Sequence, residues 1–399
     1  MSARVFDPKR KTFKVDTNRL LALTPTLEAD AEAVATTKAG ISKRPSELPN
    51  GDAGLKALSK DLARHESLRA VARGMLARCK GLPVDANGWV ELTDAYSYRG
   101  TGGRRYVDDA ALPRVDGETE RRSATLQGGH SDLRAVCCGE QAFDVDCENG
   151  DPRNLLSLAE QTALSHLVPT WIDYVQNRAA YLDEICKLHD CDASVAKRLP
   201  NVVGNGGSWG TWLRDNDLKP PAERSKAFEG KKCKAFLLPE KCRPGEHNAT
   251  RELAAIRAVL FEHPRFKAMV ETERERLVRE GLKPRHKHDT SLWSRIMQTS
   301  EDEVLSIIDR ALFDLGWDVW ALVFDGLIVA PSAACAEPDV NKALAAAQAA
   351  CERAGWKVVL AEKPLHGLQD EEPKTVTKAR AAIEIWACRE AAAAGEFED

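Results

Sequence analysis

The chain has 399 residues, of which 43% are hydrophobic and 30% charged, and its formal net charge is -4. This length and composition suit an ordinary soluble protein with a large core and two or three lobes. No run of 18 or more apolar residues occurs, and the basic start, MSARVFDPKRKTFKV, lacks the apolar stretch of a signal peptide. The sequence therefore argues against a secreted or membrane-spanning protein, and we expect no membrane partner.

The 11 cysteines are an odd number, and no pair has the C-x-x-C spacing of zinc ribbons or redox motifs. We interpret them as reduced thiols and expect an intracellular, reducing compartment, without distinguishing a nucleus, an organelle or a viral factory. The nearest approach to a metal-ligand cluster is Cys186, His189 and Cys191, which has no second half. The cysteines therefore favour neither a zinc site nor a disulfide framework.

Positive charge is concentrated in one segment of this acidic chain. Residues 219–287 contain 18 Lys and Arg against 10 Asp and Glu, a local excess of eight positive charges. Such a segment is compatible with a surface that faces phosphates, and equally with a solvated helix face, because ETERERLVREG alternates in sign.

Hydrophobic periodicity and turn signals predict a mixture of helices and short strands. Residues 1–55 are expected to be a partly disordered segment that ends in the linker-like KRPSELPNGDAG. The elements expected next are a helix over 55–79, a strand in WVELT, a Gly/Arg-rich loop in YSYRGTGGRRYVDD, a helix within 126–141 and a strand ending at 149–150. Helices on either side of Pro169 follow, and then a helix and glycine turn within 194–213. The last part is expected to form a long helix over 291–317, two strands within 318–331, a helix over 343–355 and a strand within 356–364.

Two of the predicted strands place a carboxylate at the end of an apolar run. In AFDVDCEN, the alternation of a strand puts Asp144 and Asp146 on one face. In WALVFDGLIV, Asp325 interrupts an apolar run and precedes Gly326, so we expect it at a hairpin tip. An Asp in such a run lies at the sheet rim or is held by a cation, because its burial alone is costly.

Two rim carboxylates on different strands of one sheet are suited to hold two Mg²⁺ ions, with Mn²⁺ as an alternative. The competing interpretation is a turn, since an Asp beside a Gly at a strand end is most often a turn residue. The segment between the two carboxylates favours the metal site. In SVAKRLPNVVGNGG a helix presents Lys197 to an incoming triphosphate, and a turn at Gly206 and Gly207 follows.

The order of several motifs resembles that of the family A DNA polymerases, and more closely the short palm proteins of that type found in viruses and mobile elements. The motifs are GRRY, LQ and LR, then DVDCENGDP, YVQNRAAYLDEI, the helix with Lys197, IMQTSEDEVL, VFDGLIV and a closing KP. They extend from about residue 95 to residue 365. Each motif is short and common, so the resemblance lies in their number, order and spacing.

The resemblance implies a role for each matching residue. Asp146 and Asp325 match the metal-binding aspartates of the first and third motifs, with Asp144 as an alternative or auxiliary ligand. Residues implied to contact triphosphate, primer, template or the nascent pair are Lys197, Arg134, Arg178, Asn149, Asp151, Gly206, Gly207 and Gln298.

The chain departs from the family pattern at several positions. Ala193 stands where the family has an arginine, and Asn205 stands where it has a tyrosine. Phe324 and Gly326 replace the histidine and glutamate that flank the third-motif aspartate. These departures imply activity that is low, specialised or absent.

The position that blocks a ribose 2′-hydroxyl in the family is Asp151 when counted from Asp146, which mildly favours deoxynucleotides. If Asp144 is the ligand instead, that position becomes Asn149 and the preference disappears.

The predicted fold class is α+β: a polymerase palm with a small antiparallel sheet, a helical fingers insertion and a helical, thumb-like N-terminal region. The expected boundaries are 1–55 for the N-terminal segment and linker, 56–135 for the thumb-like and first palm region, 136–154 for the first catalytic motif, 155–290 for the fingers, 291–365 for the palm with the third motif, and 366–399 for an acidic, Ala-rich tail.

The functional hypothesis is a DNA polymerase that adds deoxynucleotides to a primer 3′ end, with a DNA primer-template, dNTPs and replication proteins as its partners. One alternative keeps the fold and makes it an RNA polymerase or primase-like enzyme. A second alternative is a catalytically silent palm that binds nucleic acid. The sequence by itself leaves the three open.

Overall fold

We analysed a computed structural model of the chain. The structure describes residues 6–43, 53–98, 104–108, 125–129, 131–216, 218, 236, 248–281, 288–363, 365 and 372–394. The fold is mixed, with many helices and small antiparallel sheets, as the α+β prediction requires. Among these residues, no helix combines the length and apolarity needed to cross a membrane. His286, Pro364 and most of the linker-like segment lie outside the described residues.

The described strands are β1 (Arg10–Asp16), β2 (Trp89–Tyr98), β3 (Arg105–Val107), β4 (Phe143–Cys147), β5 (Trp317–Val323), β6 (Gly326–Pro331) and β7 (Leu360–Lys363). The helices of the first part of the chain are α1 (Thr17–Ala29), α2 (Ala31–Lys43), α3 (Ala53–Cys79), α4 (Ser131–Cys138), α5 (Gly150–Gln161), α6 (Pro169–Gln176), α7 (Arg178–His189), α8 (Ala193–Ala196), α9 (Arg198–Gly204) and α10 (Trp209–Asp215). The later helices are α12 (Ala249–Glu262), α13 (Lys267–Arg279), α14 (His288–Asp314), α15 (Val340–Arg353) and α16 (Lys374–Ala394), and short 3₁₀ turns cover Gly139–Gln141 and Ser165–Leu167.

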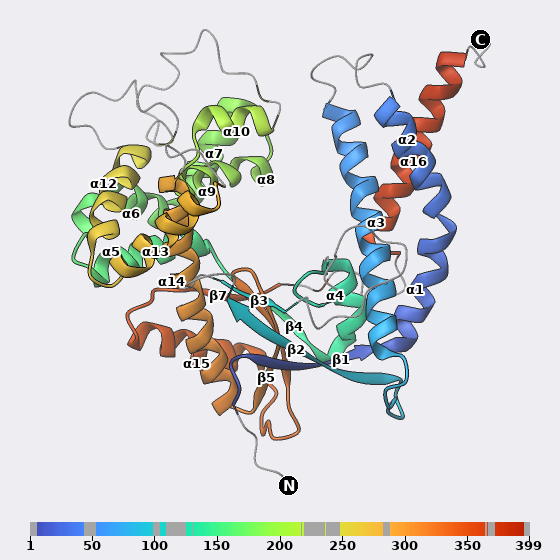
Figure 1. Cartoon of the computed structure of the whole chain (residues 1–399), viewed down its shortest axis with the longest axis horizontal. Coiled ribbons are helices and arrows are strands. Elements are labelled where there is room, and N and C mark those ends of the chain that lie inside the picture. Colours follow the sequence, from blue (N-terminus) through green and yellow to red (C-terminus); the bar gives the residue numbers. More distant parts are fainter. Residues whose placement is uncertain are drawn as a thin grey trace.

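A four-stranded antiparallel sheet in the order β5-β6-β4-β7 forms the base of the molecule (Figure 1). Its strands alternate between two cores. Val145, Leu327 and Val329 pack against α14 and α15 on one face. Ile328 and Ala330 point to the other face, toward β1, α1 and α4. Both faces are therefore covered, and of the two aspartates of β4, Asp144 is buried and Asp146 is partly exposed.

A second antiparallel sheet, β1-β2-β3, lies beside β5 and is attached to α14 by buried charges. Lys11 of β1 pairs with Asp309, and Arg105 of β3 pairs with Asp302. The hydroxyl of Tyr98 donates a hydrogen bond of 2.7 Å to Asp302. Because an unpaired buried charge would be very costly, these contacts hold the two sheets in one arrangement around α14.

One helical arm, here called the N-terminal arm, consists of α1, α2, α3 and α16. Its core includes Val34, Leu58, Leu62, Ala379 and Ala382. Within the segment 1–55, residues 10–43 form β1, α1 and α2, and the predicted tail at 366–399 contributes α16 to this arm. The apolar stripe of small residues on α16 is buried by helices that are distant in the sequence.

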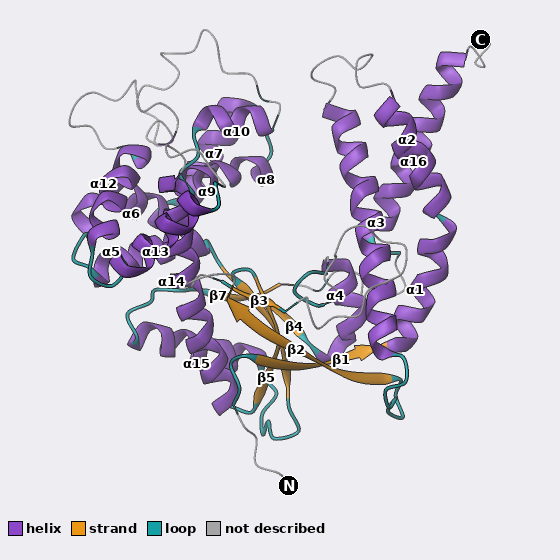
Figure 2. Cartoon of the chain, in the orientation of Figure 1, coloured by secondary structure: helices purple, strands orange, loops and turns teal. Residues whose placement is uncertain are grey.

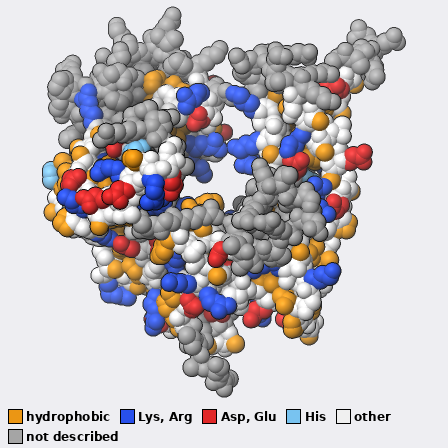
Figure 3. Space-filling view, in the orientation of Figure 1, with side chains coloured by type: hydrophobic (Ala, Val, Ile, Leu, Met, Phe, Trp, Pro, Cys, Tyr) orange, Lys and Arg blue, Asp and Glu red, His pale blue; other side chains and the backbone are white. Residues whose placement is uncertain are grey.

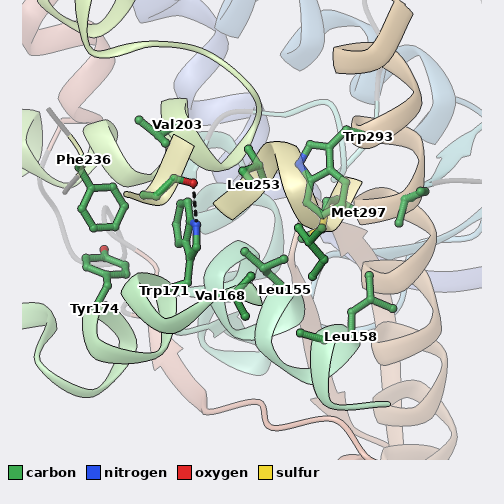
Figure 4. Packing of buried hydrophobic residues seen from close by; sticks show 14 of the residues in the cluster. Leu155, Leu158, Val168, Trp171, Tyr174, Val203, Phe236, Leu253, Trp293 and Met297 are labelled. Carbon is green, nitrogen blue, oxygen red and sulfur yellow. Dashed lines mark hydrogen bonds between the residues drawn. The ribbon is translucent and has the colours of Figure 1, made fainter. Parts of the chain in front are cut away.

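The other arm, here called the insertion arm, consists of α5 to α13 and the first half of α14, and it is inserted between β4 and β5. Fully buried aromatic side chains fill its core, with Trp171 against Tyr174 and Phe236 (Figure 4). The indole Nε1 of Trp171 donates to the carbonyl of Ala249 at 3.2 Å. The ring of Trp212 is buried in the same core and so offers no stacking surface to a base.

The two arms rise from the same side of the sheets and stand apart from each other, while α14 runs from the insertion arm down to the sheet (Figures 1 and 2). Its N-terminal half contributes Trp293 and Met297 to the core of the arm. Its C-terminal half contributes Val304 and Ile308 to the core under the sheet. A helix of 27 residues spans roughly 40 Å, so α14 fixes the arm relative to the sheet.

The packing of α16 can be tested with one matched pair of substitutions. Ala379 is fully buried in the N-terminal arm, whereas Ala381, on the same helix, is exposed. We expect Ala379→Arg to lower the free energy of unfolding by at least about 2 kcal/mol, because the arm would be overpacked and would bury a charge. Ala381→Arg should change it by less than about 0.5 kcal/mol. Equal effects in chemical denaturation would show that α16 does not pack as described.

Candidate active site

Asp146 and Asp325 lie side by side at one edge of the four-stranded sheet. In the antiparallel register of β4 and β6, Asp146 is opposite Gly326, the residue that follows Asp325. Asp325 itself lies in the two-residue turn between β5 and β6. Residues almost 180 positions apart thus come together because their strands are direct neighbours.

The position of Asp325 depends on two glycines. A Cβ atom at Gly326 would lie 2.4 Å from the carbonyl oxygen of Val145, so the backbone of β6 approaches β4 where no side chain fits. A Cβ atom at Gly150 would lie 3.2 Å from Oδ2 of Asp325. The carboxylate of Asp325 therefore fits closely against the first residue of α5, whose N-terminal end favours negative charge.

Burial and neighbouring negative charges shape the electrostatics of this pair. Burial raises the pKa of Asp325 above its ordinary value, and the charges of Asp146 and Asp151 raise it further. Burial likewise raises the pKa of Asp144, while Arg134, whose Nη2 lies 3.6 Å from Oδ2 of Asp144, opposes this shift. Burial therefore disfavours the ionised form of both carboxyl groups, and neighbouring carboxylates add to this effect at Asp325.

Lys363 at the end of β7 supplies a cation to the same place. Its Nζ lies 2.5 Å from Oδ2 of Asp146, and its side chain is 54% exposed. The register explains the contact. Because β7 pairs with β4, Lys363 lies opposite Asp144, and Asp146 is two residues farther along the same face of β4. An exposed lysine on a carboxylate is a partner that solvent or another cation can displace.

A second group of polar side chains adjoins the pair. Asp151, in the first turn of α5, accepts a hydrogen bond of 3.1 Å from Nδ2 of Asn205 in the insertion arm. Glu301 of α14 lies within hydrogen-bonding reach of Asp151, and Nε of Arg104 donates a hydrogen bond of 3.2 Å to Oε2 of Glu301. Burial, with the charge of Asp151 adding to it, raises the pKa of Glu301 to about 8. The group connects the turn of the insertion arm to the residues that precede β3.

The residues present fit a divalent cation that binds together with a ligand. In the described part of the chain, no three His, Cys, Asp or Glu side chains form a complete metal site. Mg²⁺, however, is commonly held by one or two carboxylates, with water and substrate phosphates as its other ligands. Asp146 and Asp325 provide two such carboxylates, and burial, with the charge of Asp146 adding to it, raises the pKa of Asp325, an effect that a bound cation would oppose.

The sequence also predicted contacts for residues farther from the carboxylate pair. Arg134 is turned inward, donating to the Gly129 carbonyl at 2.8 Å and facing Asp144. Asn149 makes the turn into α5 with a left-handed φ of 54°. Its Oδ1 accepts a hydrogen bond of 3.4 Å from the Tyr174 hydroxyl.

The remaining predicted residues lie in the insertion arm, including the first half of α14. Lys197 and Arg178 are exposed, at the junction of α8 and α9 and at the start of α7. Gln298 lines a polar cavity of about 440 Å³ together with Asn205 and Arg295.

The glycine turn of this arm is explained by its local backbone. Gly206 has a φ of 82°, and Thr290 and Arg257 lie beside it. A Cβ atom at Gly207 would lie 2.8 Å from the carbonyl oxygen of Val202. The predicted contact of both glycines with a nascent base pair stays a prediction.

Sequence reasoning did not identify three members of the site. Lys363, Glu301 and Arg104 all appeared in short motifs, but none of them was assigned a role. No local pattern marks a lysine at the end of a strand as the partner of a carboxylate on the next strand. Only the short polar interruption SED in the long predicted helix could have drawn attention to Glu301.

Comparisons with known proteins add little to this geometry. No protein-family model and no curated protein sequence matches the chain. Among solved structures, the POL domain of Pol1 from M. smegmatis, in complex with a DNA primer-template and dNTP, is similar over 87% of this chain and 66% of that chain. The TM-score is 0.47 and the sequence identity 12%, values too low to transfer a function.

The buried acid Glu301 makes stability depend on pH. Its pKa is about 8 in the folded protein, against an ordinary value of 4.5, so the folded state favours the protonated form. This contribution to stability is complete below about pH 4.5 and is lost as the pH rises through 8. Without divalent ions, we expect the free energy of unfolding to fall between pH 5 and 8.5, and to fall less in Glu301→Gln. The exposed control Glu271→Gln should follow the wild type in chemical denaturation at both pH values.

The close approach at Gly326 gives a second test. Gly326→Ala must push β6 away from β4, and we expect a loss of at least about 1 kcal/mol in the free energy of unfolding. Gly210→Ala on α10 is the control, because the nearest atom to its added Cβ is 3.8 Å away. A Gly326→Ala protein as stable as the control would refute the close contact.

Proposed function

We propose that this chain is a template-directed DNA polymerase that adds deoxynucleotides to a primer 3′ end by a two-metal-ion mechanism. The observation that carries the proposal is the pairing of Asp146, on β4, with Asp325, in the turn that leads into the neighbouring strand β6, at one edge of the sheet. Paired carboxylates that hold two divalent ions are the central requirement of nucleotidyl transfer.

Asp146 is the better candidate than Asp144 for the second ligand. Asp146 lies opposite Gly326, directly beside Asp325, whereas Asp144 lies opposite Ile328 and faces Arg134. The chemistry supplied by two Mg²⁺ ions, when bound, is activation of the primer 3′-hydroxyl and neutralisation of the departing pyrophosphate. The chain's part is to hold the ligands still, which the contacts at Gly150 and Gly326 do.

The space above the carboxylates suits a nucleic-acid duplex. The molecule is hollowed between its two arms, and Lys and Arg side chains lie on both sides of the opening (Figure 3). In the proposed arrangement the sheet is the palm, the insertion arm the fingers and the N-terminal arm the thumb. Helix α8 lies on the side of the insertion arm that faces the opening (Figure 1), and the exposed Lys197 directly follows this helix; we propose that Lys197 meets the triphosphate.

Asp151 is proposed to favour deoxynucleotides. It lies in the same group as Asp325, and hydrogen bonds to Asn205 and Glu301 hold its carboxylate in place. A fixed carboxylate beside the sugar would disfavour a 2′-hydroxyl by crowding. The proposal therefore includes a preference for dNTPs over NTPs.

Primer extension tests the function directly. We expect the wild type to extend a primed DNA template with Mg²⁺ or Mn²⁺ and dNTPs, and to use NTPs less well. Asp146→Asn and Asp325→Asn should each lower the rate by at least a hundredfold, because each removes a charge from the ion site. The control Asp183→Asn removes an exposed carboxylate of α7 and should stay within twofold of the wild type. Wild-type activity in Asp325→Asn would sink the assignment.

One observation favours a second candidate, a silent palm that binds nucleic acid. The Nζ of Lys363 already neutralises Asp146 at 2.5 Å, as a resident cation would. This candidate predicts salt-dependent DNA binding without synthesis under any metal or nucleotide condition. Preferential extension with NTPs would instead support the RNA polymerase or primase-like alternative.

A further inference from the structure

Phe324, the residue before Asp325, is a bulky residue at the first position of the two-residue turn between β5 and β6, where such a hairpin requires a positive φ. Its φ of 53° places a bulky side chain in the left-handed region, where glycine or asparagine is normally found. The ring is 56% exposed at the hairpin tip, although Asp325 beside it is largely buried. A strained backbone and an exposed aromatic ring both cost stability, and such strain is concentrated at functional sites.

The ring is also held from one side. The Cζ atom of Arg104 lies 5.3 Å from the centroid of the Phe324 ring, within the range of a cation–π contact. Arg104 is fixed in turn by its ion pair with Glu301, whose side chain is 5% exposed. A chain of contacts from α14 therefore supports the ring from one side and leaves its remaining surface to solvent.

We propose that Phe324 is a positioning residue on which the terminal nucleotide of the primer stacks, an inference that rests on the proposed polymerase function. The ring is adjacent in sequence to the carboxylate of Asp325 and faces solvent at the same sheet edge. Every base has an apolar π-face, so an aromatic ring takes any base there without selecting its sequence. Arg104 keeps the ring oriented and adds its charge close to the primer.

The test is a cycle of binding measurements that needs no catalysis. Dissociation constants are measured by fluorescence anisotropy without divalent ions, for a primer-template with a normal 3′ nucleotide and for one whose 3′ nucleotide lacks its base. The proteins are the wild type, Phe324→Leu, which keeps an apolar side chain, and Phe324→Tyr, which keeps the ring. Leu315→Ala serves as control, because Leu315 is 45% exposed near the other end of β5.

We expect removal of the terminal base to weaken binding by the wild type and Phe324→Tyr by roughly tenfold, the scale of one base stacked on an aromatic ring. Phe324→Leu should bind the normal primer-template roughly tenfold more weakly than the wild type does. When the terminal base is removed, its affinity should fall by less than a further twofold. Its dependence of affinity on salt should equal that of the wild type, since no phosphate contact is changed. Leu315→Ala should behave as the wild type does.

The outcomes separate this inference from the function on which it rests. If Phe324→Leu loses the same factor as the wild type on removal of the base, the stacking role is wrong, even when primer extension succeeds. If the cycle behaves as expected while the wild type extends no primer, Phe324 still contacts the primer end and the polymerase function fails. Absence of any binding by the wild type would overturn both.

Discussion

The close contact between Gly326 and the carbonyl of Val145 is the constraint on which the candidate site depends. At 2.4 Å from that oxygen no Cβ atom fits, so β6 lies tightly against β4 and its hairpin ends where Asp146 lies. Gly150 has no side chain and so leaves room for the carboxylate of Asp325, which a Cβ atom at this position would contact. The positions of both carboxylates thus depend on glycine at 150 and 326, where a side chain would not fit.

This constraint also explains one departure from the family A pattern. The sequence suggested that Gly326, in place of a second acidic residue, lowers or specialises the activity. In this backbone the side chain of a glutamate at 326 would collide with the carbonyl oxygen of Val145, and the carboxylate of Asp151 on α5 lies close to Asp325. Asn205, which stands where the family has a tyrosine, contacts Asp151. The departures are consistent with a site in which these residues act together.

Helix α14 connects the separate parts of the molecule. Along its length Trp293 is buried in the insertion arm, Glu301 reaches the carboxylate group, and Asp309 pairs with Lys11 of the second sheet. A rigid helix with these three attachments keeps the arm, the site and the sheets in register. The cost of burying its acidic residues is offset where Arg105, Arg104 and Lys11 meet them.

The sequence by itself determined the elements and residues that depend on local pattern. Periodicity of 3.6 predicted α3, α14 and α15, and alternation predicted β4 with its two aspartates on one face, because these signals depend only on neighbouring residues. The tertiary structure decided which distant groups meet. Lys363 reaches Asp146 because β7 pairs with β4, and Asp30 of the N-terminal arm meets Arg380 of α16 across 350 residues. Such contacts leave no periodic trace in the sequence, since they arise from the packing of elements whose spacing along the chain is arbitrary.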